Sequence, residues 1–311
     1  MKTIRIGTRG SRLALWQANW VKDALLRAGL SAETVVIHTR GDRQTQGPLE
    51  RLGATGVFTK EIQRGLLDGD VDLAVHSMKD LPTDPVPGIA LIAVPARFDV
   101  RDVWVSNKFR TLAELTDGAR VGTGSERRRC QLLNRFGDRV RVENIRGNVE
   151  TRLAQLDEGK FDAIILAVAG LARLGLADRI RPEAILDPSA IYPAVGQGAL
   201  AIEARTCDRE VCAQLEALND KNAMASALAE RAMLRTLEGG CIAPIGAYST
   251  IEGETLTLSG RILSLDGRTC FDAQETMPLA EAEALGKTVA EKLIQQGAGE
   301  ILETLRNRRL G

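Results

Sequence analysis

The sequence predicts an α/β fold in two units, followed by a C-terminal α+β unit with a small antiparallel sheet. Over the first two-thirds, short strand-like runs alternate with longer amphipathic segments, which is typical of helices covering both faces of largely parallel sheets. From about residue 220 this alternation stops. A long helical pattern is followed there by three strand-like runs, with hairpin turn signals at Glu252-Gly253 and Asp266-Gly267.

The first unit opens with a strand over 3–7 and a helix that begins after Ser11, a good N-cap residue, and runs to Arg27. We expect the apolar stripe of this helix to comprise Leu13, Trp16, Trp20, Ala24 and Leu25. Further strands are expected over 33–39 and 71–76, with a helix over 58–67 between them.

The pattern restarts after a loop at 95–99. We expect strands over 103–106, 120–122, 140–145 and 163–168, separated by helices that open near Ser125, Asn148 and Gly170. In the last unit we expect a helix over 222–238, strands over 245–251, 255–263 and 269–276, and helices over 279–295 and 298–306. The division into domains is therefore expected at 1–96 with 196–216, 97–195 and 217–311.

Composition excludes several classes of protein. Lys plus Arg total 41 and Asp plus Glu total 41, and this neutral balance argues against a nucleic-acid or membrane-surface partner. No apolar run approaches the roughly 20 residues that cross a bilayer, and the first ten residues resemble a strand rather than a signal segment, so we expect a cytoplasmic protein. The five cysteines are scattered and only two histidines accompany them, which favours free thiols and no metal site.

Basic residues recur where strands give way to helices. They lie in the segments 8–12 and 123–129, and in 145–148 with Arg152 nearby. A cation in the first helical turn opposes the helix dipole, so this placement indicates an anion that binds there. Because guanidinium groups bind bidentately, carboxylate or phosphate is the expected anion. The alternative is a set of solvated surface arginines.

The segment from His76 to Asp80 is a second candidate site. A buried strand ends at His76, and Ser77, Lys79 and Asp80 follow it into a loop. An acid inside a cationic pocket can stay ionised and stabilise a developing cation. The residues alone leave open an alternative in which Lys79 and Asp80 form a surface ion pair and His76 packs in the core.

Cys241 follows a helix and a Gly-Gly break. A helix C-terminus does not lower a thiol pKa, and neither histidine lies nearby in sequence, so a Cys–His hydrolase is not supported. On physical grounds alone Cys241 would be an idle thiol. The same interpretation applies to Cys130, Cys207, Cys212 and Cys270.

Taken together, these segments resemble the hydroxymethylbilane synthase (porphobilinogen deaminase) family. The motifs that carry the resemblance are TRGSRLALWQ (8–17), TRGD (39–42), AVHSMKDLP (74–82), RRRCQL (127–132), RGNVETRL (146–153), AIILAVAGLARLGL (163–176), PAVGQGA (193–199) and LEGGCIAPIG (237–246). They span about residues 4 to 247, and beyond Gly246 the resemblance is in pattern only.

The resemblance implies two periplasmic-binding-protein-like α/β domains with the active site between them. It implies a monomeric transferase that condenses four molecules of porphobilinogen into a linear tetrapyrrole. A dipyrromethane cofactor would be attached through a thioether to Cys241. Asp80 would be the catalytic carboxylate, assisting the loss of ammonia and stabilising the resulting azafulvenium cation.

The other implied site residues surround the cofactor and the growing chain, and the basic residues among them, with Ser11 and Ser77, would hold their acetate and propionate groups. The cofactor-binding residues are Cys241, Ser77, Lys79, Asp80, Thr123, Ser125, Arg127, Arg128, Arg146 and Gly147, and the substrate-binding residues are Arg9, Ser11, Phe58, Arg152, Arg173 and Gln197. Asp42 and Phe58 would lie in a flexible loop segment. Arg51 and Thr55 depart from the lysines common in relatives, which makes the contribution of that loop to elongation less certain.

Two rival interpretations come from other classes. A non-catalytic polycarboxylate-binding protein with a two-lobed cleft would also use arginine clusters. Against it stand the third unit, the absence of an export signal and Cys241 at the attachment position. A phosphate-handling transferase would use the helix N-termini, but the sequence has no GxxxxGK[ST] loop to support it.

Overall fold

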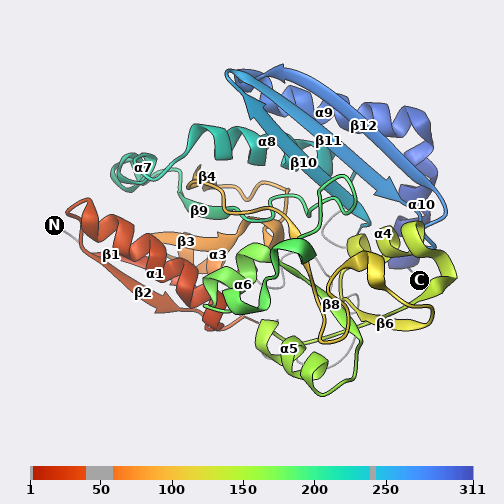
Figure 1. The fold of residues 1–311 in the computed structure, drawn as a ribbon. Coiled ribbons are helices and arrows are strands. Elements are labelled where there is room, and N and C mark those ends of the chain that lie inside the picture. The colour runs from red at the N-terminus through yellow and green to blue at the C-terminus, as the bar shows by residue number, and fades with distance from the viewer. Residues whose placement is uncertain (1–2, 40–58, 239–242, 311) are drawn as a thin grey trace.

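The computed structural model describes residues 3–39, 59–238 and 243–310, and contains three sheets (Figure 1). The first sheet has the strand order β2-β1-β3-β9-β4. Its strands are β1 (Ile4–Thr8), β2 (Ala32–Val36), β3 (Leu73–Ser77), β4 (Ile89–Ala93) and β9 (Leu200–Arg205). Its helices are α1 (Arg12–Arg27), α3 (Lys60–Leu67) and α7 (Arg209–Glu216).

The second sheet has the order β5-β8-β6-β7. Its strands are β5 (Asp102–Val105), β6 (Ala119–Gly122), β7 (Val140–Glu143) and β8 (Ala163–Ala167), and its helices are α4 (Glu126–Phe136), α5 (Val149–Asp157) and α6 (Val168–Arg173). Strand β8, with the sequence AIILA, is buried along its whole length. Such a continuous apolar run is typical of a strand that is covered on both faces.

Both α/β sheets are largely parallel, as predicted, and each contains one antiparallel strand, β9 in the first sheet and β5 in the second. Strand β1 pairs parallel with β2 and β3, whereas β9 pairs antiparallel with both β3 and β4. In the second sheet, β5 pairs antiparallel with β8. Strands β4 and β9 are absent from the sequence analysis. The chain leaves the first sheet after β4 and returns to it as β9, so it enters from the opposite end and runs antiparallel.

The two segments that join these sheets lie against each other. The amide of Phe98 donates to the carbonyl oxygen of Gly198 at 3.2 Å, and the Arg97 side chain donates to the Gln197 carbonyl at 2.9 Å. Gly198 has φ +85°, and a Cβ there would lie 2.6 Å from the Phe98 carbonyl oxygen. Only glycine fits this close crossing.

The C-terminal unit is an antiparallel meander, as predicted. It comprises β10 (Ile245–Glu252), β11 (Thr255–Leu263) and β12 (Cys270–Pro278), with α8 (Lys221–Thr236), α9 (Ala282–Leu293) and α10 (Gly299–Leu310). Helices α8 and α9 pack against this sheet around a core that includes Met233, Leu258 and Val289 (Figure 1). The predicted class, α/β with a small C-terminal antiparallel sheet, is confirmed.

Two helix predictions need correction. Trp16 does not face the core but is 37% exposed. The predicted Ala24 and Leu25 are buried, and the other buried residues of α1 are Ala14, Gln17, Ala18 and Val21. The helix expected to open near Gly170 begins at Val168, directly after β8.

Candidate functional site

A small cavity lies where β1 and β3 end. These neighbouring parallel strands bring their carboxyl ends to the same edge of the sheet, which is where ligands bind in open α/β sheets. The cavity has a volume of about 60 Å³, and its lining includes Arg9, Ser11, Ser77 and Asp80. The structure therefore gathers four of the expected site residues from two separate sequence segments.

Local hydrogen bonds fix two hydroxyl groups of this cavity. Ser11 caps α1, since its side chain accepts a hydrogen bond from the Ala14 amide at 3.3 Å. The Ser77 hydroxyl accepts a hydrogen bond from the buried Gln17 side chain at 2.7 Å. The predicted cap at Ser11 is confirmed, and it places the hydroxyl beside the cavity.

Lys79 and Asp80 lie in a single 3-10 turn that directly follows β3, and the Asp80 side chain is exposed. Burial is the main cause of a pKa of Lys79 lowered to about 8, with the charges of Arg128 and Arg127 acting in the same direction and those of Asp80 and Asp102 opposing it. Lys79 therefore lies within the electrostatic reach of the arginines of the second sheet. The simple alternative of a surface ion pair does not describe this lysine.

Arg152 shares the same environment. Its pKa is lowered to about 10, mainly by burial and also by the charges of Arg128 and Arg146, while the charge of Asp80 opposes this shift. Its Nε donates to the Gly147 carbonyl oxygen at 2.9 Å. Asp80 of the first α/β unit thus lies near several cations of the second unit. Each cation disfavours the charged form of the neighbouring cations and so lowers their pKa values.

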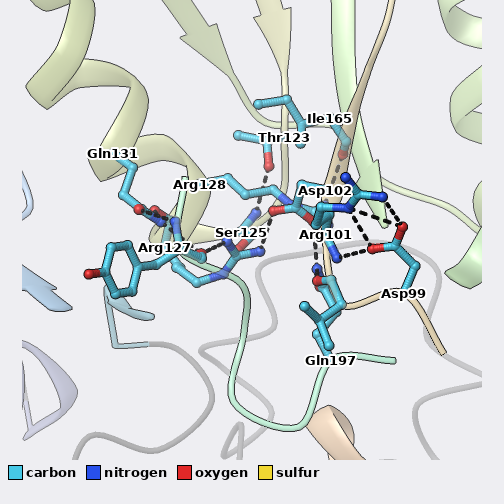
Figure 2. A network of polar contacts seen from close by, with 12 residues as sticks. Asp99, Arg101, Asp102, Thr123, Ser125, Arg127, Arg128, Gln131, Ile165 and Gln197 are labelled. Atoms are coloured by element: carbon cyan, nitrogen blue, oxygen red, sulfur yellow. Dashed lines mark hydrogen bonds and ion pairs between the residues drawn. The ribbon is translucent and has the colours of Figure 1, made fainter. Parts of the chain in front are cut away.

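Arg127 and Arg128 are buried and converge on Asp102, the first residue of β5 (Figure 2). Arg127 Nη2 lies 2.9 Å from Asp102 Oδ2, and Arg128 Nη2 lies 2.7 Å from Oδ1. Burial alone would raise the pKa of Asp102, but the two guanidinium charges outweigh it and hold that pKa well below its usual range. These arginines are therefore fixed groups rather than solvated surface cations.

Asp102 is a residue of this site that was not predicted from the sequence. The available signal was one acid at the start of the otherwise apolar run DVWV, and charges are rarely buried without a partner. Gln197 completes the group, because its Nε2 donates to Asp102 Oδ1 at 2.8 Å and to the Val100 carbonyl at 2.7 Å (Figure 2).

Arg173, on α6, lies between two aromatic rings. Its guanidinium carbon is 5.7 Å from the centre of the Trp16 ring and 5.8 Å from that of Phe98. Its Nη2 donates to the Gly198 carbonyl oxygen at 2.7 Å, and burial lowers its pKa to about 10. Arg173 is thus held against the segment that returns to the first sheet.

The remaining expected residues lie on the second sheet. Thr123 is buried and its hydroxyl accepts a hydrogen bond from the Ser125 amide at 3.2 Å. Ser125 precedes α4 but its side chain makes no capping bond, which corrects the predicted cap, whereas Asn148 caps α5 through the Thr151 amide at 2.8 Å. Gly147 has φ +109°, and a Cβ there would lie 2.6 Å from Thr151 Cγ2.

Several of the predicted positions lie outside the described residues. Cys241 and Phe58 fall outside, together with Asp42, Arg51 and Thr55. Lys60 begins α3 and is exposed. Within the described ranges, no group of three or more His, Cys, Asp or Glu side chains could hold a metal ion.

The donor set fits a ligand that carries several carboxylates. Among the residues that the structure describes, the buried Nε donors of Arg127 and Arg173 have no hydrogen-bond partner. A buried donor without a partner costs roughly 1–3 kcal/mol, and Lys79 and Arg152 lose part of their proton affinity to burial and to neighbouring cations. Carboxylates that bind here would relieve both costs, and dipyrromethane bears such groups.

The fold and the site define an α/β protein with a cation-rich site beside an exposed carboxylate. The family model "Porphobilinogen deaminase, dipyromethane cofactor binding domain" matches residues 4–213, and "Porphobilinogen deaminase, C-terminal domain" matches residues 224–295. The porphobilinogen deaminase of Syntrophotalea carbinolica is 46% identical over 304 residues, which cover 97% of this chain and 96% of that relative. The chain belongs to the porphobilinogen deaminase family.

Among solved structures, the methionine-binding protein MetQ is 14% identical with a TM-score of 0.45. The match covers 73% of this chain and 94% of the MetQ chain. A periplasmic substrate-binding protein of an ABC transporter from Coxiella burnetii is 17% identical with a TM-score of 0.42, covering 73% and 96%. The three sheets described above, rather than these similarities, establish the architecture.

Proposed function

We propose that this chain is a hydroxymethylbilane synthase. It is a transferase that joins four porphobilinogen molecules onto a covalently held dipyrromethane primer with loss of four ammonia molecules. Water then cleaves the bond between the primer and the new chain, which releases the linear tetrapyrrole hydroxymethylbilane and leaves the primer on the protein. The observation that carries the proposal is the family match, which extends over both the cofactor-binding domain and the C-terminal domain. The 46% identity over nearly the whole of a curated porphobilinogen deaminase supports the same activity.

Asp80 is the proposed catalytic residue. In each condensation the bond between the aminomethyl carbon of porphobilinogen and its nitrogen breaks, and that carbon bonds to the free α-carbon of the terminal pyrrole, which loses a proton. The exposed carboxylate of Asp80 accepts hydrogen bonds from pyrrole N–H groups and stabilises the cation that develops on the substrate as ammonia leaves. Its position at the end of β3, beside the cavity, suits this role.

Cys241 is the proposed attachment residue, through a thioether. When bound there, the dipyrromethane supplies the nucleophilic pyrrole carbon on which the chain grows. We assign its carboxylates to Ser77, Lys79, Thr123, Ser125, Arg127, Arg128 and Arg146, with Gly147 beside them, and those of the incoming substrate to Arg9, Ser11, Arg152 and Arg173. Phe58 and Gln197 are proposed as further residues of the substrate site. The ion pairs with Asp102 hold Arg127 and Arg128 in place before any carboxylate arrives.

We also propose a monomeric, cytoplasmic enzyme with domains at 1–96 with 196–216, 97–195 and 217–311. The sheet memberships support these boundaries, since β9 joins the first sheet and α8 packs with the C-terminal unit. In the described part of the chain, no helix is long and apolar enough to cross a membrane.

Turnover of porphobilinogen tests the proposal directly. Purified protein incubated with porphobilinogen should release one ammonia for each molecule consumed and yield a linear tetrapyrrole detectable by mass spectrometry. The Asp80→Asn variant should retain the primer but condense very slowly, because the lost charge acts mainly in the transition state. Near-normal turnover by Asp80→Asn would remove Asp80 from the role proposed here.

A further inference from the structure

Arg231, on α8, donates hydrogen bonds to the backbone immediately after Asp80. Its Nη1 lies 3.0 Å from the Leu81 carbonyl oxygen, and its Nη2 lies 2.7 Å from the Pro82 carbonyl oxygen. These partners are about 150 positions apart in the chain. A side chain of the C-terminal unit therefore contacts the turn that carries the proposed catalytic carboxylate.

The same turn packs on α8 through apolar contacts. Met78 and Leu81, on either side of Lys79 and Asp80, belong to one buried cluster with Ala223 and Ala227 of α8. The Leu81 amide donates to the Met78 carbonyl at 3.1 Å and closes the turn. Asp80 is exposed while residues two before it and one after it are buried, so its position depends on how this turn rests on α8.

The chemistry of Arg231 indicates a positioning role. Burial lowers the pKa of its guanidinium, and the charge of Glu203 partly offsets this effect. Within the described ranges its hydrogen bonds go to two carbonyl oxygens and not to a carboxylate. Burying part of a cation against neutral acceptors costs desolvation free energy, so packing alone does not explain an arginine at this position. Its planar guanidinium donates to two consecutive carbonyl oxygens at once, which a lysine cannot do in the same geometry.

We infer that Arg231 is a positioning residue for Asp80, which it serves by clamping the 78–82 turn to α8. The inference rests on the proposed function. Helix α8 ends at Thr236, and Cys241 follows it by five positions in the sequence. One helix thus holds the catalytic turn and leads to the proposed primer attachment residue, so the clamp ties the position of the carboxylate to the element that precedes the primer.

The first test is the kinetics of Arg231→Met, which keeps most of the apolar stem and removes the fork. We expect kcat to fall at least tenfold with KM changed less than about threefold, because a small misplacement of a reacting group acts on the chemical step. The kcat of Arg231→Lys should lie between those of Arg231→Met and the unmodified enzyme. Arg235→Met is the matched control, since Arg235 lies one turn further along α8 and its side chain forms an ion pair with the exposed Glu283 at 3.5 Å. Its kcat should stay within about twofold.

A double-mutant cycle then separates positioning from general damage. If Arg231 acts through Asp80, Arg231→Met should lower kcat less than about twofold in an Asp80→Asn background. A further tenfold loss in that background would overturn the inference. Unchanged kcat in Arg231→Met would also overturn it while leaving the proposed function intact, whereas failure of the unmodified enzyme to consume porphobilinogen would refute the function itself.

Hydrogen exchange of the 78–82 peptide gives a readout that needs no activity. Arg231→Met should speed exchange of the Leu81 amide about tenfold or more, while the β3 amides and the Arg235→Met control remain unchanged. Equal exchange in all three proteins would show that Arg231 does not hold this turn.

Discussion

Asp102 stabilises the site by compensating two buried guanidinium groups. The Asp102 side chain is fully buried, as are most of Arg127 and Arg128. Asp102→Asn keeps the shape but removes the charge, leaving two uncompensated cations. We expect the free energy of unfolding at pH 7 to fall by about 3 kcal/mol or more, measured by urea denaturation. Asp99→Asn is the control, because Asp99 pairs with Arg101, which is two residues away in sequence and more exposed than Arg127 and Arg128. This substitution should lower the free energy of unfolding by less than about 1 kcal/mol.

The pH dependence of this difference has a definite sign. The pKa of Asp102 is depressed in the folded state, so its contribution is fully present above the unfolded pKa of about 3.9 and is lost as pH falls below it. The stability gap between the unmodified protein and Asp102→Asn should therefore be constant from about pH 5 to 8 and narrow below about pH 4. A gap that closes near neutrality would contradict this assignment.

Lys79 should make binding of the primer's carboxylates sensitive to alkaline pH. Its pKa is lowered to about 8, mainly by burial, so its charge is present at pH 7 and is lost as pH rises through 8. Assembly of the primer from porphobilinogen on primer-free protein, followed by intact-protein mass spectrometry, should therefore slow between about pH 7 and 9. Because the guanidinium of Lys79→Arg stays charged, a flat profile is expected for that variant; equal profiles for both proteins would exclude Lys79 as the titrating group.

The contribution of Lys79 to the free energy of unfolding changes with pH in the opposite direction to its contribution to carboxylate binding. Between pH 8 and about 10.4 the unfolded chain binds more protons at this position than the folded protein does, so the Lys79 contribution to stability increases with pH. The site therefore holds this charge at a cost to folding, and bound carboxylates offset that cost.

At the scale of elements, α8 and α9 pack unusually closely. A Cβ at Gly286 in α9 would lie 2.2 Å from the Ala229 carbonyl oxygen and 2.8 Å from Ala232 Cβ. Gly286→Ala should destabilise the protein by about 1–3 kcal/mol through this overlap, although alanine favours helices by about 1 kcal/mol. Thermal unfolding measures the difference.

Gly170→Ala provides the matched comparison. Gly170 lies inside α6, and a Cβ there would have nothing within 4 Å. This substitution should therefore be neutral or stabilising by up to about 1 kcal/mol. If both variants lost the same stability, the close packing of α8 on α9 would not be the cause.

Local signals predicted the elements better than the sheets. The Ser11 and Asn148 caps and the C-terminal hairpins are confirmed because each depends on residues close in sequence. The direction of β9 depends on where the chain returns to the first sheet, which no local pattern encodes. Trp16 fits a helical stripe by spacing, yet it packs against Arg173 of the other α/β unit rather than against its own core.

At the scale of the whole molecule, a neutral chain concentrates cations at one site. The net charge is zero, while arginines and a lysine from both α/β units influence one another around Asp80. The sequence predicted an anion site from its arginine segments but not which arginines are held by Asp102. That pairing joins residues 25 and 26 positions apart across a folded sheet.

Intact-protein mass spectrometry with peptide mapping tests the central claim most directly. The purified enzyme, before or after incubation with porphobilinogen, should carry an adduct of two linked pyrrole units on the peptide that contains Cys241, and Cys241→Ser should lack it. Cys130 is an internal reference, because burial raises the pKa of its thiol to about 12 and it should remain unmodified. A Cys241 peptide that stays unmodified after incubation, or an adduct on another cysteine, would contradict the account.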